Sequence, residues 1–267
     1  MYRIDRDVLE NKMNLTLMPQ DKAVISLKGN ELTEPAAMRK FLAAYAVHIH
    51  ALDDTVAAAY FSSWFGDVVS ALQYAVSIHD TALDLSLSNL TVHLIPEEGY
   101  TRLAFQLSSR QENWAPEEER SEWRRAVFTS FYQYTARPLM DCLAAVSGLP
   151  IGQAWGQLPD SLVNGMDRLA SEPLSESVSK QVAEDYLYLQ KGLEGELFGL
   201  SRNPFDKKER WIEDPRDAAK QLRMKSTCCL HYKRENRTYC YTCPRMKEAD
   251  RLLWLEKLRS KKENGGQ

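Results

Sequence analysis

The sequence predicts a mainly helical α+β fold: a helix-rich body with a small antiparallel sheet, followed by a C-terminal cysteine-rich segment. Two stretches, residues 38–49 and 178–197, carry apolar side chains at intervals of three and four, the spacing of one face of a helix. Between residues 83 and 107, apolar side chains alternate with polar ones, as they do in strands. The 267 residues can form one large core with a small appendage.

The ends of the expected helices are marked by capping and breaking residues. Thr33 and Pro35 suit a helix start, and Gly148 suits a helix end. Arg137 and Pro138 are expected to break one helix and begin another. The expected helices, in chain order, are 33–49, 53–64 with an interruption at Gly66 before a further stretch through residue 72, 117–134, 138–148, 177–197 and 244–258.

The strands are expected at residues 83–87, 90–94 and 103–107, and residues 96–99 supply a turn of the kind that joins neighbouring strands. Residues 201–217 lose periodicity and contain two prolines, which predicts a connection. We therefore divide the chain into a body, residues 1–200, and a second unit, residues 201–267, which holds the connection, the cysteine segment and a terminal helix.

Composition indicates an ordinary globular protein, with 44% hydrophobic and 27% charged residues. No run approaches the roughly 18 apolar residues that a membrane-spanning helix needs. The first residues also lack an apolar segment behind a basic one, which a secretory leader would have. We therefore expect a cytoplasmic protein without a transmembrane segment.

The formal net charge of −3 hides an uneven distribution. Residues 220–247 contain eight Lys or Arg side chains and one acid, Glu235, so this stretch carries +7 and the rest of the chain −10. The cysteine segment is a basic region on an acidic protein, which favours anionic ligands or acidic partners there.

Four of the five cysteines fall within sixteen residues, in the pattern C-C-x10-C-x2-C. In a reducing compartment such crowding indicates metal binding, because thiolates are the preferred ligands of zinc and of iron–sulfur clusters. Structural zinc sites normally use two C-x2-4-C pairs, whereas here one pair is adjacent and its side chains tend to point apart. The spacing favours a cluster over zinc and leaves both open. The fifth cysteine, Cys142, lies in an apolar stretch and is expected to be buried and inert.

The string Cys-Cys-Leu-x-Tyr followed by a basic residue, then ten residues from the second cysteine to Cys-x-x-Cys-Pro, resembles the C-terminal signature of the FhuF family of ferric siderophore reductases. The similarity covers residues 223–244. It implies a 2Fe–2S cluster bound by Cys228, Cys229, Cys240 and Cys243, and a hydroxamate or citrate-hydroxamate siderophore as the partner, held by the body.

A reductase of this kind would release iron, because the hard oxygen donors that bind Fe(III) hold Fe(II) far more weakly. The sequence shows no Gly-rich dinucleotide turn and no Walker-type loop, so an external donor such as a ferredoxin is implied, and no acid, base or nucleophile is needed beyond the cluster. The basic side chains expected to contact substrate or donor are Lys225, Lys233, Arg234, Arg237 and Arg245.

Two other functions are consistent with the same residues. One is a zinc-stabilised binding module without enzymatic activity, in which the basic segment recognises an acidic partner. The other is an iron–sulfur redox sensor, although the chain lacks a helix-turn-helix pattern and we expect no nucleic-acid partner.

Overall fold

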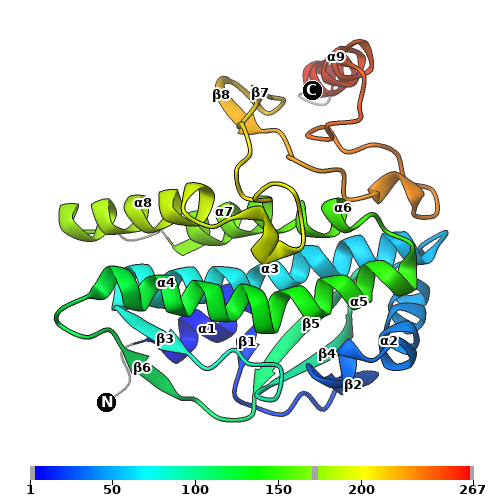
Figure 1. Ribbon diagram of the computed structural model, residues 1–267. Coiled ribbons are helices and arrows are strands. Elements are labelled where there is room, and N and C mark those ends of the chain that lie inside the picture. Colours follow the sequence, from blue (N-terminus) through cyan, green and yellow to red (C-terminus); the bar gives the residue numbers. More distant parts are fainter. Residues whose placement is uncertain (1–3, 170–173, 265–267) are drawn as a thin grey trace.

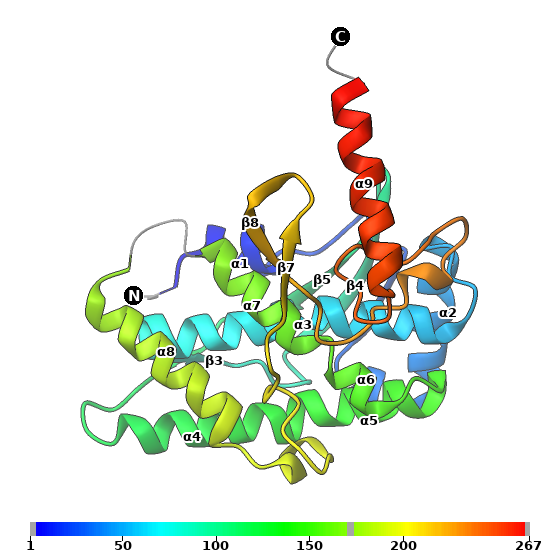
Figure 2. The same ribbon diagram turned by 90° about the horizontal axis from the view of Figure 1, so that it is seen from above.

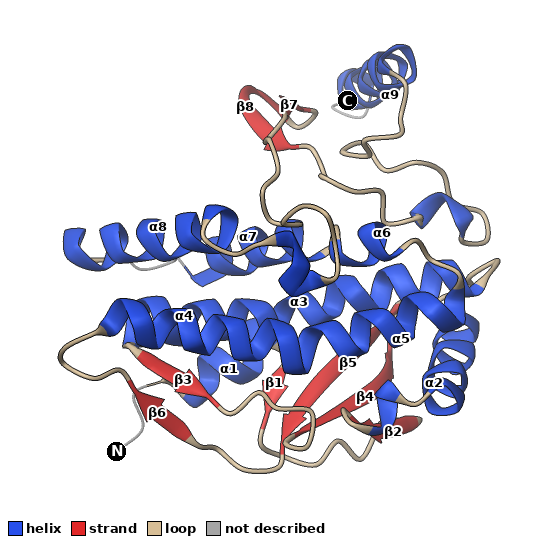
Figure 3. Cartoon of the chain, in the orientation of Figure 1, coloured by secondary structure: helices blue, strands red, loops and turns tan. Residues whose placement is uncertain are grey.

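The computed structural model describes residues 4–169 and 174–264 and confirms the predicted α+β, mainly helical fold. A layer of helices covers the sheet, and the C-terminal segment lies on the opposite side of these helices (Figures 1 and 3). In the part of the chain that the structure describes, no helix has both the length and the apolar character needed to cross a membrane.

The 26-residue helix α3 (Asp54–His79) runs through the middle of the body. Asp53 caps it by accepting a hydrogen bond from the backbone N–H of Thr55 at 3.0 Å. The predicted interruption at Gly66 is wrong, because the helix is continuous there. A Cβ atom on Gly66 would lie 2.1 Å from the Cβ of Ser161. The glycine therefore permits close packing of a neighbouring helix and does not end α3.

A four-stranded sheet with the order β1-β5-β4-β2 lies beneath the helices. The predicted hairpin is present, with Val92 opposite Phe105 and Gly99 at φ 82° in its turn. The first strand pairs in parallel with β5, and two further short strands form a separate antiparallel pair. The strands are β1 (Leu15–Thr16), β2 (Ile25–Lys28), β3 (Thr81–Leu83), β4 (Leu90–Glu97), β5 (Tyr100–Leu107) and β6 (Glu112–Trp114).

The strand expected at residues 83–87 is therefore misplaced, because Leu85 and Leu87 follow β3 in a loop. Both side chains still pack into or against the core. The alternation of apolar and polar residues at 83–87 therefore reflects burial of these leucines in a loop and not a strand.

The remaining helices of the body surround α3. The break expected at Arg137 and Pro138 is a π-helical turn, η2 (Tyr132–Ala136), in which Arg137 N–H donates to the carbonyl of Tyr132. Pro138 lies in the first turn of the next helix, directly after this π-helical turn. The helices are α1 (Arg6–Met13), α2 (Pro35–His48), α4 (Arg120–Phe131), α5 (Arg137–Ser147), α6 (Ile151–Trp155), α7 (Leu158–Leu169) and α8 (Glu176–Lys191).

The chain from α8 onward differs from the expectation in three places. Helix α8 ends at Gly192 and does not continue to Leu197. The expected connection contains a strand, β7 (Trp211–Asp214), which forms a hairpin with β8 (Asp217–Arg223). The last helix, α9 (Glu248–Asn264), begins four residues after Pro244, because backbone turns occupy residues 240–246. Helix α9 projects away from the body (Figure 2).

Candidate metal centre

The four clustered cysteines lie on two loops that follow the β7–β8 hairpin. The backbone N–H of Lys225 donates to the carbonyl of Thr242 at 3.0 Å, which holds the start of the first loop against the second. In the second loop, the N–H of Cys243 donates to the carbonyl of Cys240 at 2.9 Å. A backbone turn therefore links the two cysteines of the C-x-x-C pair.

The cysteine sulfurs are arranged in two pairs, each joining one loop to the other. The sulfurs of Cys228 and Cys243 are 3.5 Å apart. The thiol of Cys240 donates a hydrogen bond to the sulfur of Cys229. Among the described residues, no group of three or more His, Cys, Asp or Glu side chains is placed closely enough to hold a metal ion. The adjacent cysteines thus contribute to different pairs, as expected for side chains that point apart.

These sulfurs are shielded from water, and none is in a disulfide. Cys228, Cys229 and Cys243 are at most 8% exposed, and Cys240 is partly buried. The fifth cysteine, Cys142, is also buried but lies in α5 among the core residues of the body. Its pKa is raised by burial, which agrees with the expectation of an inert thiol.

The body holds the first loop through helices α6 and α7. The side-chain amides of Gln153 and Gln157 donate to the carbonyl of Cys228 at 2.9 and 3.2 Å. The carboxylate of Asp160 accepts the backbone N–H of Ser226 at 2.9 and 3.1 Å. These contacts fix the main chain on both sides of Thr227 and so orient the paired cysteines.

Gly156 allows the loop to approach these helices closely. A Cβ atom at this position would lie 2.2 Å from the side-chain oxygen of Thr227, which is far inside van der Waals contact. Only a residue without a side chain therefore permits the observed position of the residue that precedes the paired cysteines.

A partly buried lysine sets the electrostatics of one sulfur pair. The Lys225 ammonium nitrogen lies 3.4 Å from the sulfur of Cys229. The hydrogen bond from Cys240 and the charge of Lys225 lower the pKa of the Cys229 thiol to about 5. Although burial alone would lower the pKa of Lys225, the neighbouring thiolate raises it. Cys229 and Lys225 therefore form a thiolate–ammonium pair near neutral pH.

The thiols of Cys228 and Cys240 favour their protonated form when no metal is bound. Burial raises the pKa of Cys228 to about 11. The hydrogen bond that Cys240 donates to Cys229, together with burial, raises the pKa of Cys240. Metal binding to these thiols would therefore release protons.

His231 connects the same sulfur to the body. Its backbone N–H donates to the sulfur of Cys229, and its ring nitrogen Nδ1 lies 2.7 Å from the phenol oxygen of Tyr60 on α3. Burial lowers the pKa of His231, which keeps the imidazole neutral at pH 7. The main chain of His231 thus contacts the sulfur, whereas its ring contacts the body.

The five basic side chains singled out in the sequence are in different environments. Lys225 is at the sulfurs, as described. Lys233 forms an ion pair with Asp53 at 2.8 Å, and Arg245 donates to the phenol of Tyr232 at 3.2 Å. Arg234 donates to the carbonyl of Ile49 at 2.7 Å, and Arg237 is exposed to solvent. Only Lys225 is brought into contact with a clustered cysteine.

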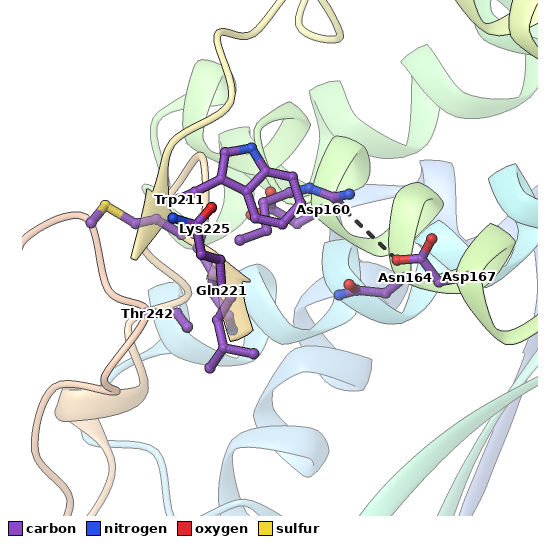
Figure 4. Close-up of a pocket in the computed structure, with 10 residues that line it drawn as sticks. Asp160, Asn164, Asp167, Trp211, Gln221, Lys225 and Thr242 are labelled. Carbon is purple, nitrogen blue, oxygen red and sulfur yellow. Dashed lines mark ion pairs between the residues drawn. The ribbon is translucent and has the colours of Figure 1, made fainter. Parts of the chain in front are cut away.

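A pocket of about 350 Å³ opens beside the cysteine loops (Figure 4). Asp160, Asn164 and Asp167 share one face of α7 and line it on the body side. Trp211 and Gln221 enter from the β7–β8 hairpin, and Lys225 and Thr242 from the cysteine loops.

Sequence reasoning missed the residues that hold the loops in place. Gln153, Gln157, Asp160 and Tyr60 lie 65 or more residues before the cysteines that they support. Nothing in their local pattern distinguishes them from ordinary polar or aromatic residues. Only their contacts with the cysteine segment in the folded chain identify them.

A comparison with known protein families finds a match in the cysteine segment. Residues 226–245 match the family model described as the FhuF 2Fe-2S C-terminal domain. No curated protein matches the chain. The match covers both cysteine pairs and confirms the resemblance and the cofactor predicted from the sequence. Residues 226–245 are therefore similar to an FhuF-type 2Fe–2S C-terminal domain.

Proposed function

We propose that Cys228, Cys229, Cys240 and Cys243 are the ligands of the 2Fe–2S cluster. A 2Fe–2S cluster takes four cysteine thiolates, two on each iron. The two sulfur pairs, Cys228 with Cys243 and Cys229 with Cys240, supply this donor set. The pairing favours a cluster over the zinc alternative, in which four sulfurs surround one ion.

The activity that this centre supports best is the one-electron reduction of a ferric siderophore in the cytoplasm, which releases Fe(II). The observation that carries the proposal is the 2Fe–2S domain match over two buried cysteine pairs. When bound, the cluster supplies electrons one at a time. Siderophore oxygens hold Fe(III) tightly and Fe(II) weakly, so one electron is enough to loosen the complex. A ferredoxin or another one-electron donor replaces that electron.

The protein's own residues tune and protect this exchange. The ammonium of Lys225 offsets negative charge on the Cys229 sulfur and therefore favours the reduced, more negative state. Burial of the sulfurs keeps water away from them. The amides of Gln153 and Gln157 keep the Cys228 main chain fixed while the charge of the centre changes.

The first test is spectroscopic. Protein purified without oxygen should contain iron, absorb visible light and give an electron paramagnetic resonance signal after reduction with dithionite. The reduced protein should then convert a ferric hydroxamate or citrate-hydroxamate complex to Fe(II), detected with a ferrous chelator. A colourless protein that contains about one zinc per chain would contradict the proposal.

The second test separates the clustered cysteines from the fifth one. Cys240→Ser should abolish both the visible cluster and reduction, while far-ultraviolet circular dichroism shows a folded body. Cys142→Ser is the matched control, because Cys142 lies in α5 of the body, and it should retain both properties. Reduction of ferric siderophore by cluster-free Cys240→Ser would exclude the proposed route.

A further inference from the structure

A second pocket, of about 500 Å³, lies where the body meets the loop that follows His231. Its volume is within the range of small-molecule sites, roughly 300–1,000 Å³. Tyr60 and Trp64 of α3 line one wall, Tyr100 at the start of β5 lines another, and Arg234 and Arg237 contribute from the cysteine segment. Three segments of the chain therefore meet around one cavity with aromatic and cationic walls.

Main-chain hydrogen bonds hold the cysteine segment against the loop between α2 and α3, beside this pocket. The N–H of Leu52 donates to the carbonyl of Lys233 at 3.0 Å, and the N–H of Glu235 donates to the carbonyl of His50 at 2.9 Å. Arg234 adds its bond to the carbonyl of Ile49, and its guanidinium lies 5.5 Å from the centre of the Tyr60 ring. The cationic wall is thus fixed relative to the aromatic one.

The charges of this pocket favour an anion. Among the described residues, the exposed guanidinium of Arg237 has no hydrogen-bond or ion-pair partner. The carboxylate among the lining side chains, Glu97, accepts a bond from Arg102 at 2.8 Å, so its charge is offset by a residue outside the pocket. Arg234 and Arg237 therefore leave the cavity with an excess of positive charge.

The pocket of Figure 4 has the opposite character. Asp160 and Asp167 present carboxylates to it. Its Arg223 is engaged by Glu209 at 3.3 Å and by Asp167 at 4.0 Å, and its Lys225 is engaged by the sulfur of Cys229. An anionic complex would meet two carboxylates there and no available cation.

The cationic pocket is also connected to the sulfurs. Tyr60, in its wall, is hydrogen-bonded at 2.7 Å to the ring of His231, and the N–H of His231 donates to the sulfur of Cys229. His231 thus links the pocket wall, through Tyr60, to the sulfur of Cys229.

We propose that this pocket, lined by Tyr60, Trp64, Tyr100, Arg234 and Arg237, binds an anionic ferric complex, one whose iron is held by carboxylate as well as hydroxamate oxygens. The assignment rests on the proposed reductase function and narrows its substrate class. Fe(III) in the pocket would become Fe(II) by taking one electron from the reduced 2Fe–2S centre, which would thereby be oxidised, and no bond to the protein would form. A one-electron donor protein would then reduce the centre again. The citrate-hydroxamate class fits, and a neutral trihydroxamate complex fits less well.

Gallium complexes test binding separately from reduction, because Ga(III) matches the charge and size of Fe(III) and is not reduced. Isothermal titration of the cluster-loaded, oxidised protein with the Ga(III) complex of a citrate dihydroxamate should give saturable binding. The neutral Ga(III) trihydroxamate complex should bind about tenfold more weakly. Comparable affinities for the two complexes, or no binding of the citrate complex, would overturn the assignment.

Two variants locate the site. Arg237→Gln removes an exposed guanidinium of the pocket and should weaken binding of the citrate complex about tenfold, the loss expected for one charge-assisted contact. Arg245→Gln removes the same charge from the same segment outside the pocket and should change the affinity less than twofold. If the two variants weaken binding of the citrate complex equally, or if neither weakens it, the complex does not bind in this pocket.

The reductase proposal can fail independently. If the wild-type protein binds the citrate complex through Arg237 but reduces no ferric complex, the binding site is supported and the reductase function is excluded. If the protein reduces ferric complexes while Arg237→Gln leaves binding unchanged, the reductase function is supported and the binding site is excluded.

Discussion

The ammonium nitrogen of Lys225 lies 3.4 Å from the sulfur of Cys229, and the lysine is partly buried. A fixed positive charge at this distance stabilises the state of the centre that carries one more electron. Of the five basic residues singled out in the sequence, Lys225 is the one that contacts a cysteine sulfur.

Lys225→Gln should therefore lower the reduction potential of the cluster, by an amount on the order of 50 to 100 mV, and leave the iron content near that of the wild type. A spectroelectrochemical titration measures the shift. Lys233→Gln is the control, because Lys233 lies in the same basic segment but pairs with Asp53; its potential should move far less. Equal shifts would show that only the total charge of the segment matters.

A second prediction concerns Gly156. Gly156→Ala would place a Cβ atom 2.2 Å from the side-chain oxygen of Thr227, so the loop before Cys228 must move. We expect a loss of roughly 1–3 kcal/mol in the free energy of unfolding and a cluster that is lost faster on exposure to air. Denaturant unfolding and the decay of the visible absorption measure the two effects.

The neighbouring glycine of α6 provides the control. A Cβ atom at Gly152 would meet no heavy atom within 4 Å, and alanine suits a helix better than glycine does. Gly152→Ala should therefore leave the cluster unchanged and stabilise the protein slightly. A cluster equally short-lived in both variants would mean that the contact of Gly156 with Thr227 is not the cause.

The sequence predicted those parts of the molecule whose signals are local. Residues close together in the chain mark the four clustered cysteines, helix α2 and the β4–β5 hairpin. The structure contains the predicted helix and hairpin and brings the cysteines together. The end of α5 at Gly148 was predicted for the same reason: glycine readily adopts the left-handed conformation found there, φ 73°.

Features that depend on distant contacts were not predictable from local pattern. Gly66 looks like a helix breaker until Ser161 is seen packed against it. Gln153, Gln157 and Asp160 look like ordinary polar residues until the loop of Cys228 folds onto them. Helix α6 is only five residues long and contains a glycine, so it gives almost no periodic signal of its own.

A third prediction concerns Asp185, a carboxylate of α8 that is fully buried. It accepts hydrogen bonds from Arg120 at 2.7 Å, Arg124 at 2.8 Å and Ser77 at 2.8 Å. Although burial alone would raise its pKa, the two guanidiniums and the hydroxyl lower it. Asp185→Asn leaves two arginines without their shared carboxylate, and we expect a loss of about 3–5 kcal/mol in the free energy of unfolding at pH 7.

The pH dependence gives this prediction its sign. Because the folded-state pKa of Asp185 lies below its unfolded value of about 3.9, the stabilisation is fully present above that value and is lost as the pH falls through the folded pKa. The stability difference between wild type and Asp185→Asn should be constant from pH 8 to 5 and narrow below pH about 4. Denaturant unfolding at several pH values measures this difference.

Glu184→Gln is the control. Glu184 is one residue away, is exposed and pairs with Lys180, so the change should alter the free energy of unfolding by less than about 0.5 kcal/mol at every pH. A difference for Asp185→Asn that widened as the pH fell would contradict the buried carboxylate–guanidinium network.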